Sequence, residues 1–83
     1  MKLLYFAWVR QKIGVSEEEF TPPAGVNNVA QLIDALRTRG PGYNAALGDP
    51  KRIRAAVNQH HVGLDAPVRA DDEVAFFPPV TGG

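Results

Sequence analysis

The fold of this chain depends on the stretch EVAFFPPVTGG, residues 73–83. Its first five residues alternate in the way typical of a strand, with Val74 and Phe76 facing a core and Phe77 facing outward. The two prolines that follow cannot donate a hydrogen bond to a neighbouring strand, so the strand must end there and the chain must leave it extended. The rest is a short tail with neither a charged side chain nor a strong helix former.

The other end of the chain supplies a neighbour for this strand. Residues 2–9, KLLYFAWV, are rich in aromatic and aliphatic side chains and too few for a typical helix, so we predict a strand. One face of such a strand carries Leu3, Tyr5, Ala7 and Val9, and the other carries Leu4, Phe6 and Trp8. A strand that is apolar on both faces is usually central in its sheet. We therefore expect the first and last strands to lie side by side in the middle.

One helix is clear. Residues 29–40, VAQLIDALRTRG, carry apolar residues at the spacing of a buried helical stripe, namely Val29, Leu32, Ile33 and Leu36. Asn28 is the predicted N-cap, and Gln31 is its predicted capping-box partner. Gly40 followed by Pro41 marks the end of the helix.

The remaining segments complete a small sheet. EEEFT, residues 17–21, predicts a polar edge strand that pairs back on the first strand. IRAAVN, residues 53–58, and HVGL, residues 61–64, predict two more strands, and YNAALG, residues 43–48, predicts one helical turn. This order of elements predicts an α+β fold in which a mixed sheet of about five strands carries one main helix across one face.

Three large aromatic side chains point away from the predicted core. If the first and last strands are adjacent, Phe6, Trp8 and Phe77 lie on the sheet face that the helix leaves uncovered. Such a cluster indicates a binding patch. The alternative is that Tyr43 or Leu47, from the irregular region after the helix, folds over these aromatics.

Composition excludes several classes of protein. Among the 83 residues, nine Lys and Arg balance nine Asp and Glu, so no overall field favours nucleic acid or an anionic membrane. There is no cysteine, which removes disulfides, thiolate metal sites and cysteine nucleophiles. The apolar run near the N-terminus is too short for a membrane span of about 20 residues and lacks a signal cleavage site. We expect a cytoplasmic protein.

Catalytic side chains are scarce. His60 and His61 are adjacent, so on a strand they point to opposite faces and cannot share a metal ion. Ser16 has no histidine near it in sequence, and a turn role is more typical. Asp71, Asp72 and Glu73 read as turn residues before a strand. We predict no metal site and no stand-alone enzyme.

The tail carries the remaining chemistry. We assign residues 1–78 to the folded domain and 79–83 to a flexible tail. Gly82 and Gly83 present no side chains, so a terminal carboxylate could pass down a narrow channel into another protein's active site. A carboxylate is unreactive until it is activated, for example as an acyl-adenylate. We therefore predict that the tail carries the reactive group and that the folded domain positions it.

These features resemble a known family. The segments KLLYFAWVR at the start, AAVNQ at residues 55–59 and above all DEVAFFPPVTGG at residues 72–83 are similar to the small, sulfur-carrying subunits of molybdopterin synthases, which have the ubiquitin-like β-grasp fold. The similarity extends over essentially the whole chain. Two positions depart from the family pattern. Asp71 stands where a glycine is usual, and we expect it to keep a left-handed turn. His61 stands where an apolar residue is expected on the docking face.

The resemblance implies a cycle with two partners. An adenylating enzyme would use ATP to activate the Gly83 carboxylate, and a sulfur donor protein would convert it to a thiocarboxylate. The tail would then enter the large synthase subunit and deliver sulfur to cyclic pyranopterin monophosphate, twice for each dithiolene of molybdopterin. The resemblance also implies a heterotetramer and no permanently bound cofactor. The residues implied to act are Gly83 as the sulfur carrier, Gly82, Thr81, Val80 and Pro79 as the inserted tail, and Phe6, Trp8, His61 and Phe77 as the partner interface.

Three other functions are compatible with the same tail. The chain could carry sulfur for another pathway, such as thiamine thiazole synthesis. It could be a ubiquitin-like modifier that is attached to lysines of target proteins. It could also be a β-grasp interaction module with an inert tail, which would keep its partner affinity after loss of Gly83.

Overall fold

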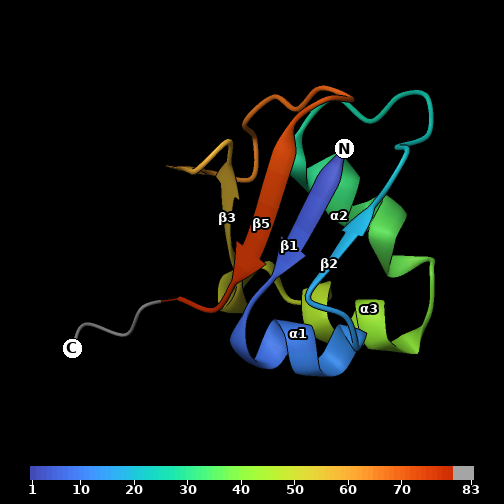
Figure 1. The fold of residues 1–83 in the computed structure, drawn as a ribbon, viewed down its shortest axis with the longest axis vertical. Coiled ribbons are helices and arrows are strands. Elements are labelled where there is room, and N and C mark those ends of the chain that lie inside the picture. The colour runs from blue at the N-terminus through green and yellow to red at the C-terminus, as the bar shows by residue number, and fades with distance from the viewer. Residues whose placement is uncertain (80–83) are drawn as a thin grey trace.

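The computed structural model describes residues 1–79, and its secondary structure follows the predicted α+β pattern (Figure 1). Five strands form one mixed sheet in the order β2-β1-β5-β3-β4. β1 runs parallel to β5, and the other neighbouring pairs are antiparallel. The strands are β1 (Lys2–Tyr5), β2 (Glu17–Glu19), β3 (Arg54–Val57), β4 (His60–Val62) and β5 (Glu73–Phe77), and the helices are α1 (Ala7–Ile13), α2 (Val29–Arg37) and α3 (Pro41–Leu47).

The central position of the first and last strands is confirmed. β5 is the middle strand of the five, with β1 on one side and β3 on the other. α2 lies across one face of the sheet, and Figure 1 shows the opposite face of β1 and β5 without a helix over it. Burial alternates along β5 as predicted, because Val74 and Phe76 are both fully buried while Phe77 is not.

α2 forms as the sequence indicated, with its apolar stripe buried and Asn28 as its N-cap. The Asn28 side chain accepts a hydrogen bond from the backbone N–H of Gln31 at 2.8 Å. The Gln31 side chain accepts in return from the backbone N–H of Asn27 at 2.7 Å, one residue earlier than a capping box would place it. Both bonds satisfy N–H groups at a helix start that would otherwise lack partners.

The predicted first strand is too long. It ends at Tyr5, and residues 7–13 form α1. The backbone N–H of Phe6 still bonds the Phe76 carbonyl at 3.1 Å, but the carbonyl of Phe6 accepts from the N–H of Val9, which starts the helix. Gly14 ends it in the left-handed conformation, donating to the Arg10 carbonyl. Val9 is fully buried as predicted, but as a helical residue.

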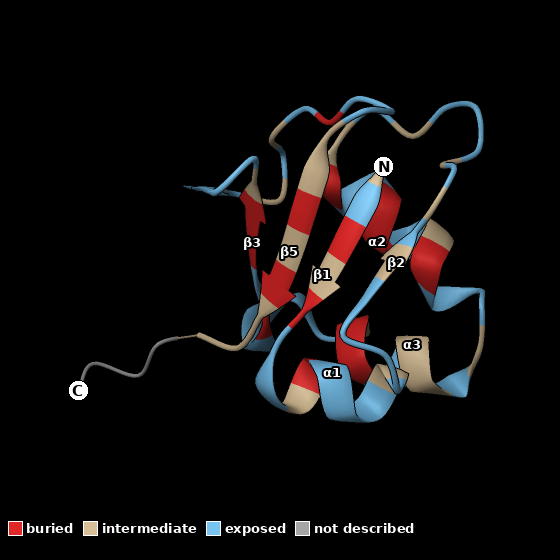
Figure 2. Ribbon diagram, in the orientation of Figure 1, coloured by how far each residue is buried: buried red, intermediate tan, exposed pale blue. Residues whose placement is uncertain are grey.

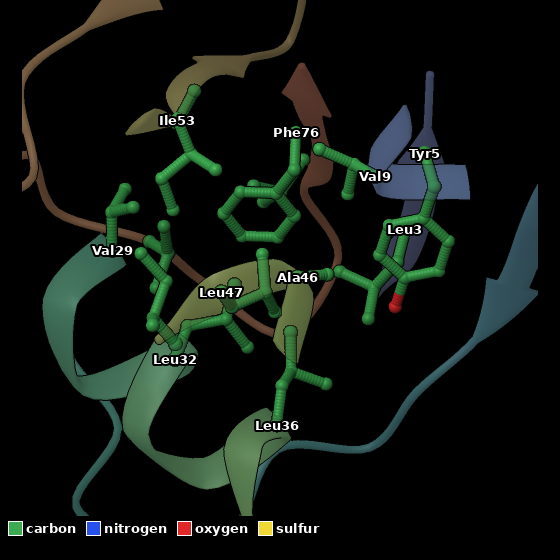
Figure 3. Close-up of a cluster of buried hydrophobic side chains, with 14 residues drawn as sticks. Leu3, Tyr5, Val9, Val29, Leu32, Leu36, Ala46, Leu47, Ile53 and Phe76 are labelled. Atoms are coloured by element: carbon green, nitrogen blue, oxygen red, sulfur yellow. The ribbon is translucent and has the colours of Figure 1, made fainter. Parts of the chain in front are cut away.

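The predicted single turn after α2 is a two-turn helix, α3, with Pro41 in its first turn. The fold therefore has three helices where the sequence indicated one clear one. Leu47 is buried and Tyr43 is half-buried against the core. Figure 3 shows the shared core, in which α2 and α3 meet the sheet residues Leu3, Tyr5 and Phe76. The Tyr5 and Phe76 rings stack with centroids 6.3 Å apart.

α1 and α3 approach closely at Gly42. A Cβ atom built at this position would meet the backbone carbonyl oxygen of Lys12, which cannot move without shifting α1. We expect Gly42→Ala to destabilise the protein by about 1–3 kcal/mol through this overlap, measured by urea denaturation. Helix propensity alone favours alanine over glycine by about 1 kcal/mol. An unchanged or increased stability would therefore contradict the close packing of these helices.

The edge strand β2 is held by a partly buried carboxylate. The sequence indicated that its acidic residues face water, but the Glu18 side chain is only 17% exposed. Its oxygens accept hydrogen bonds from the hydroxyls of Tyr5 and Tyr43, each at 2.7 Å, and from Arg39 Nη1 at 2.9 Å. Burial alone would raise the pKa of Glu18, but the bonds from Tyr43, Tyr5 and Arg39 outweigh it, so the pKa is lowered.

We expect Glu18→Gln to cost about 1–3 kcal/mol of stability at neutral pH, because two tyrosine hydroxyls and Arg39 lose a charged acceptor. Since the folded pKa of Glu18 is lowered, this stabilisation is fully present above the unfolded pKa of about 4.3 and is lost as pH falls through the folded value. Urea denaturation at several pH values should show that the wild-type loses this part of its stability in acid and that the variant lacks it. Glu17→Gln, at an exposed ion pair with Lys2, is the control and should change little. Equal effects of the two substitutions would refute the assignment.

Candidate functional site: the helix-free sheet face and the base of the tail

The candidate site is the face of the sheet opposite α2, at the end of β5 from which the tail continues. Strand alternation places Leu4 of β1, Ala75 and Phe77 of β5 and Ala56 of β3 on this face. Ala75 pairs with both Leu4 and Ala56, so small and apolar residues lie at its centre. In Figure 2 the buried positions of β1 and β5 alternate with partly exposed ones, which belong to this face.

Phe77 and His61 lie together on this face. β4 pairs with β3 so that His61 lies opposite Ala56, and Arg54 lies opposite Phe77. The ring centroids of His61 and Phe77 are 5.1 Å apart with the planes tilted by 48°. The structure thus brings together two residues that lie far apart in the sequence. The prediction that Phe77 faces away from the core while Phe76 enters it is confirmed.

Phe6 extends the same end of the face. Its side chain is 48% exposed, a large apolar surface left open to solvent. Its backbone remains extended and bonds to Phe76, so it continues the pairing of β1 with β5 for one more residue. Phe6 therefore lies level with Phe77 in the register that pairs Tyr5 with Phe76.

Trp8 occupies a different environment. It belongs to α1 and is partly buried against the core, so the strand that grouped it with Phe6 is wrong. The guanidinium of Arg52 lies 4.9 Å above its ring, a cation–π arrangement. An interface role for Trp8 stays a prediction. The alternative, in which Tyr43 or Leu47 folds over the outward aromatic side chains, is wrong. Both residues pack on the core side of the sheet, where the Tyr43 and Tyr5 ring centroids lie 6.4 Å apart.

The turn before β5 is stabilised by hydrogen bonds to Asp72 and not by the left-handed conformation expected at Asp71. Among non-glycine residues of the described chain, positive φ occurs at Ala7, Asn58 and Gln59 and not at Asp71. Instead, the Asp72 carboxylate accepts hydrogen bonds from the backbone N–H of Arg69 at 2.7 Å and from the Asn58 side chain at 3.0 Å. Of these left-handed residues, Asn58 and Gln59 form the turn between β3 and β4, and Ala7 begins α1.

The part of the chain that the structure describes offers little support for a metal site, a small-molecule pocket or a membrane span. Within residues 1–79 there is no group of three metal-ligating side chains. A small pocket of ≈ 130 Å³ opens between α2 and α3 near Ile33 and Leu47, smaller than the volume of about 300 Å³ at which ligand sites begin. Over the same residues, no helix is long and apolar enough to cross a membrane.

The base of the tail follows directly from β5. The strand ends at Phe77, and Pro78 and Pro79 follow it as predicted. α1 also contacts β5, and this contact helps to hold the last strand in place. The predicted acting residues Val80, Thr81, Gly82 and Gly83 lie outside the described residues, and their roles stay predictions.

Comparison with known proteins gives consistent matches over the whole sequence. The profile of the ThiS family matches residues 3–83. A protein named molybdopterin synthase sulfur carrier subunit from Escherichia coli is 42% identical over 83 residues, covering 100% of this chain and 99% of the relative.

Two solved structures carry the same fold. The crystal structure of SAMP1 from Haloferax volcanii matches with a TM-score of 0.78 and 27% identity, covering 100% of this chain and 98% of that one. A putative molybdopterin converting factor, subunit 1, from Pyrococcus furiosus matches with a TM-score of 0.68 and 30% identity, covering 95% of each chain. The expected β-grasp fold is thereby confirmed.

Proposed function

The chain belongs to the ThiS family, and from that premise we propose that it is the sulfur carrier of a molybdopterin synthase. The observation that carries the proposal is the full-length similarity to curated sulfur carrier subunits, at 42% identity for the Escherichia coli protein. The geometry supports it, because β5 is paired on both sides and thus gives the tail a rigid base. The scarcity of side-chain nucleophiles in the sequence agrees with a carrier whose chemistry resides in a backbone carboxylate.

The chemistry takes place at Gly83. Its carboxylate oxygen attacks the α-phosphate of ATP, pyrophosphate leaves, and a glycyl-adenylate forms. A sulfur nucleophile then adds to the carbonyl carbon and AMP departs, which leaves a thiocarboxylate. In the synthase, the thiocarboxylate sulfur displaces an oxygen substituent from a carbon of cyclic pyranopterin monophosphate and forms a thioester. Water then cleaves the acyl carbon–sulfur bond, which leaves the sulfur on the pterin and returns the Gly83 carboxylate. Gly82 allows the passage of the tail, and Val80 and Thr81 contact the channel into which it inserts.

Partners supply everything that this cycle needs beyond the tail. The adenylating enzyme binds ATP, a sulfur donor protein provides the sulfur, and the large synthase subunit provides the catalytic side chains. We assign Phe6, His61 and Phe77 to the docking of these partners, with Trp8 at the margin. The cycle takes place in the cytoplasm, and the working synthase is a heterotetramer with two large and two small subunits.

Reconstitution tests the pathway. The purified chain, the adenylating enzyme and the large subunit from the same organism are incubated with ATP, a sulfide donor and cyclic pyranopterin monophosphate. We expect molybdopterin to form, detected as its fluorescent oxidation product. Replacing the large subunit with a thiazole synthase is the matched control and should give no thiazole. Thiazole formation without molybdopterin would instead assign the chain to thiamine synthesis.

A second function rests on the structural match to SAMP1, the small archaeal modifier protein 1 of Haloferax volcanii. Attachment to lysines would use the same activated Gly83 carboxylate but would form an isopeptide bond. Mass spectrometry of cell proteins would then find lysines carrying a Gly-Gly remnant from this chain. Their absence in cells that make molybdopterin would leave the sulfur carrier as the sole function.

A further inference from the structure

The balanced net charge of the chain conceals a separation of charge along β5. Asp71, Asp72 and Glu73 lie at the start of the strand. The end of the strand lies beside β3, where Arg54 pairs with Phe77. Arg54 is preceded in sequence by Lys51 and Arg52, so the cations lie where the tail begins and the acids lie at the other end.

The three cations, which we call the basic collar (Lys51, Arg52 and Arg54), are exposed and unpaired within the described chain. No carboxylate of residues 1–79 lies within 4.0 Å of their charged groups. Asp49, the nearest acid in sequence, accepts from the backbone N–H of Lys51 at 3.0 Å and caps the 3-10 turn. Of the six other Lys and Arg side chains, ion pairs engage three, namely Lys2, Arg37 and Arg39.

Two collar side chains are held in place by the fold. The Arg54 guanidinium donates to the carbonyl oxygen of Ile53 at 2.9 Å, and Arg52 lies over the Trp8 ring. Neither contact neutralises a positive charge. Both reduce the side-chain freedom that would be lost when a partner binds. The collar is thus a partly preorganised positive rim beside the exposed rings of Phe77 and His61.

We infer that the basic collar selects a docking partner whose surface carries carboxylates around an apolar socket. The apolar face would fill the socket, while the collar would meet the acidic rim and guide association. The inference rests on the proposed function, which requires that face to dock. Charge complementarity of this kind sets association rate and orientation more than it adds affinity.

The arrangement fits a protein better than a nucleic acid. The acidic group at the start of β5 lies only about 13 Å from the collar, given a rise of about 3.3 Å per residue. A phosphate backbone following the face would meet those carboxylates. The surface between the two charged ends is apolar, which suits a protein socket with charges confined to one side.

Association kinetics with the large synthase subunit test the inference. We expect Lys51→Gln/Arg54→Gln to slow association about tenfold at 50 mM NaCl, with dissociation changed less than about twofold and the difference absent at 500 mM. Arg69→Glu is the control, because it lowers the net charge of the chain by the same amount but at the acidic end, where the Arg69 side chain forms no ion pair with the described residues. Circular dichroism establishes that all variants fold.

Two results would overturn the inference. One is association of the double variant at the wild-type rate with the wild-type dependence on salt. The other is collar-dependent binding to a 20-base-pair DNA duplex at 150 mM NaCl, with partner association unchanged. Either result leaves the proposed function standing if the chain still acquires sulfur at Gly83. Failure to acquire sulfur, with a collar that still guides association, would instead remove the function and keep the interface.

Discussion

We expect removal of Gly83 to abolish molybdopterin formation in the reconstituted system and to leave the fold and stability of the domain unchanged. The proposed reaction needs the terminal carboxylate to reach the active sites of the partner proteins. A tail that is shorter by one residue would not extend far enough to place it there. Among residues 1–79, which the structure describes, the buried core extends from Leu3 to Phe76, so we expect stability not to change. Activity is measured as molybdopterin per large subunit, and stability by urea denaturation.

A matched variant distinguishes the effect of tail length from the effect of side-chain size at the last residue. Gly83→Ala keeps the length and the carboxylate but adds a methyl group, so we expect reduced activity and not complete loss. Binding of the shortened chain to the large subunit should persist, because the docking face is unaltered. Activity of the shortened chain within about twofold of wild-type would contradict a Gly83-centred mechanism and would favour an interaction module with an inert tail.

Phe77→Asp is the second large effect that we expect. A carboxylate in place of an outward aromatic ring buries an unpaired charge on docking, which should cost at least 2 kcal/mol, or about 30-fold in affinity for the large subunit. The fold should survive, because the inward neighbour Phe76, which is fully buried, is untouched. Titration calorimetry measures the affinity and circular dichroism the fold.

Two controls make this result specific. Val15 is another exposed apolar residue, 44% exposed, in the connection between α1 and β2. Val15→Asp should therefore leave the affinity unchanged. Phe76→Asp should instead unfold the domain, because it places a charge in the core. Undiminished binding of Phe77→Asp would remove the helix-free face from the docking surface.

The strands and the main helix could be predicted because local patterns agree with the tertiary structure. The α2 stripe, its Asn28 cap and the alternation around Phe76 all follow from spacing that the fold preserves. The predicted first strand is too long because residues 3–9, LLYFAWV, are aromatic or aliphatic throughout, so periodicity does not show where the strand ends and the helix begins. Two signals were available: Val9 and Ile13 at helical spacing, and Gly14 as a C-cap.

The candidate site also contains some residues that local sequence can indicate and others that depend on tertiary contacts. The roles of the tail residues stay predictions, which the sequence allows because the proposed chemistry depends only on residue type and order. Glu18 could not be recognised as a partly buried acceptor, since its tyrosine partners come from β1 and α3. The basic collar depends on the register that sets Arg54 beside Phe77, and long-range pairing of this kind leaves no local pattern.

The central claim is that the Gly83 carboxylate becomes a thiocarboxylate, and intact-mass spectrometry tests it most directly. The chain is incubated with ATP, its adenylating enzyme and a sulfide donor, then weighed and digested. We predict a mass increase equal to the difference between sulfur and oxygen, confined to the peptide ending at Gly83 and absent without ATP. An unchanged mass under conditions in which ATP is consumed would contradict the account.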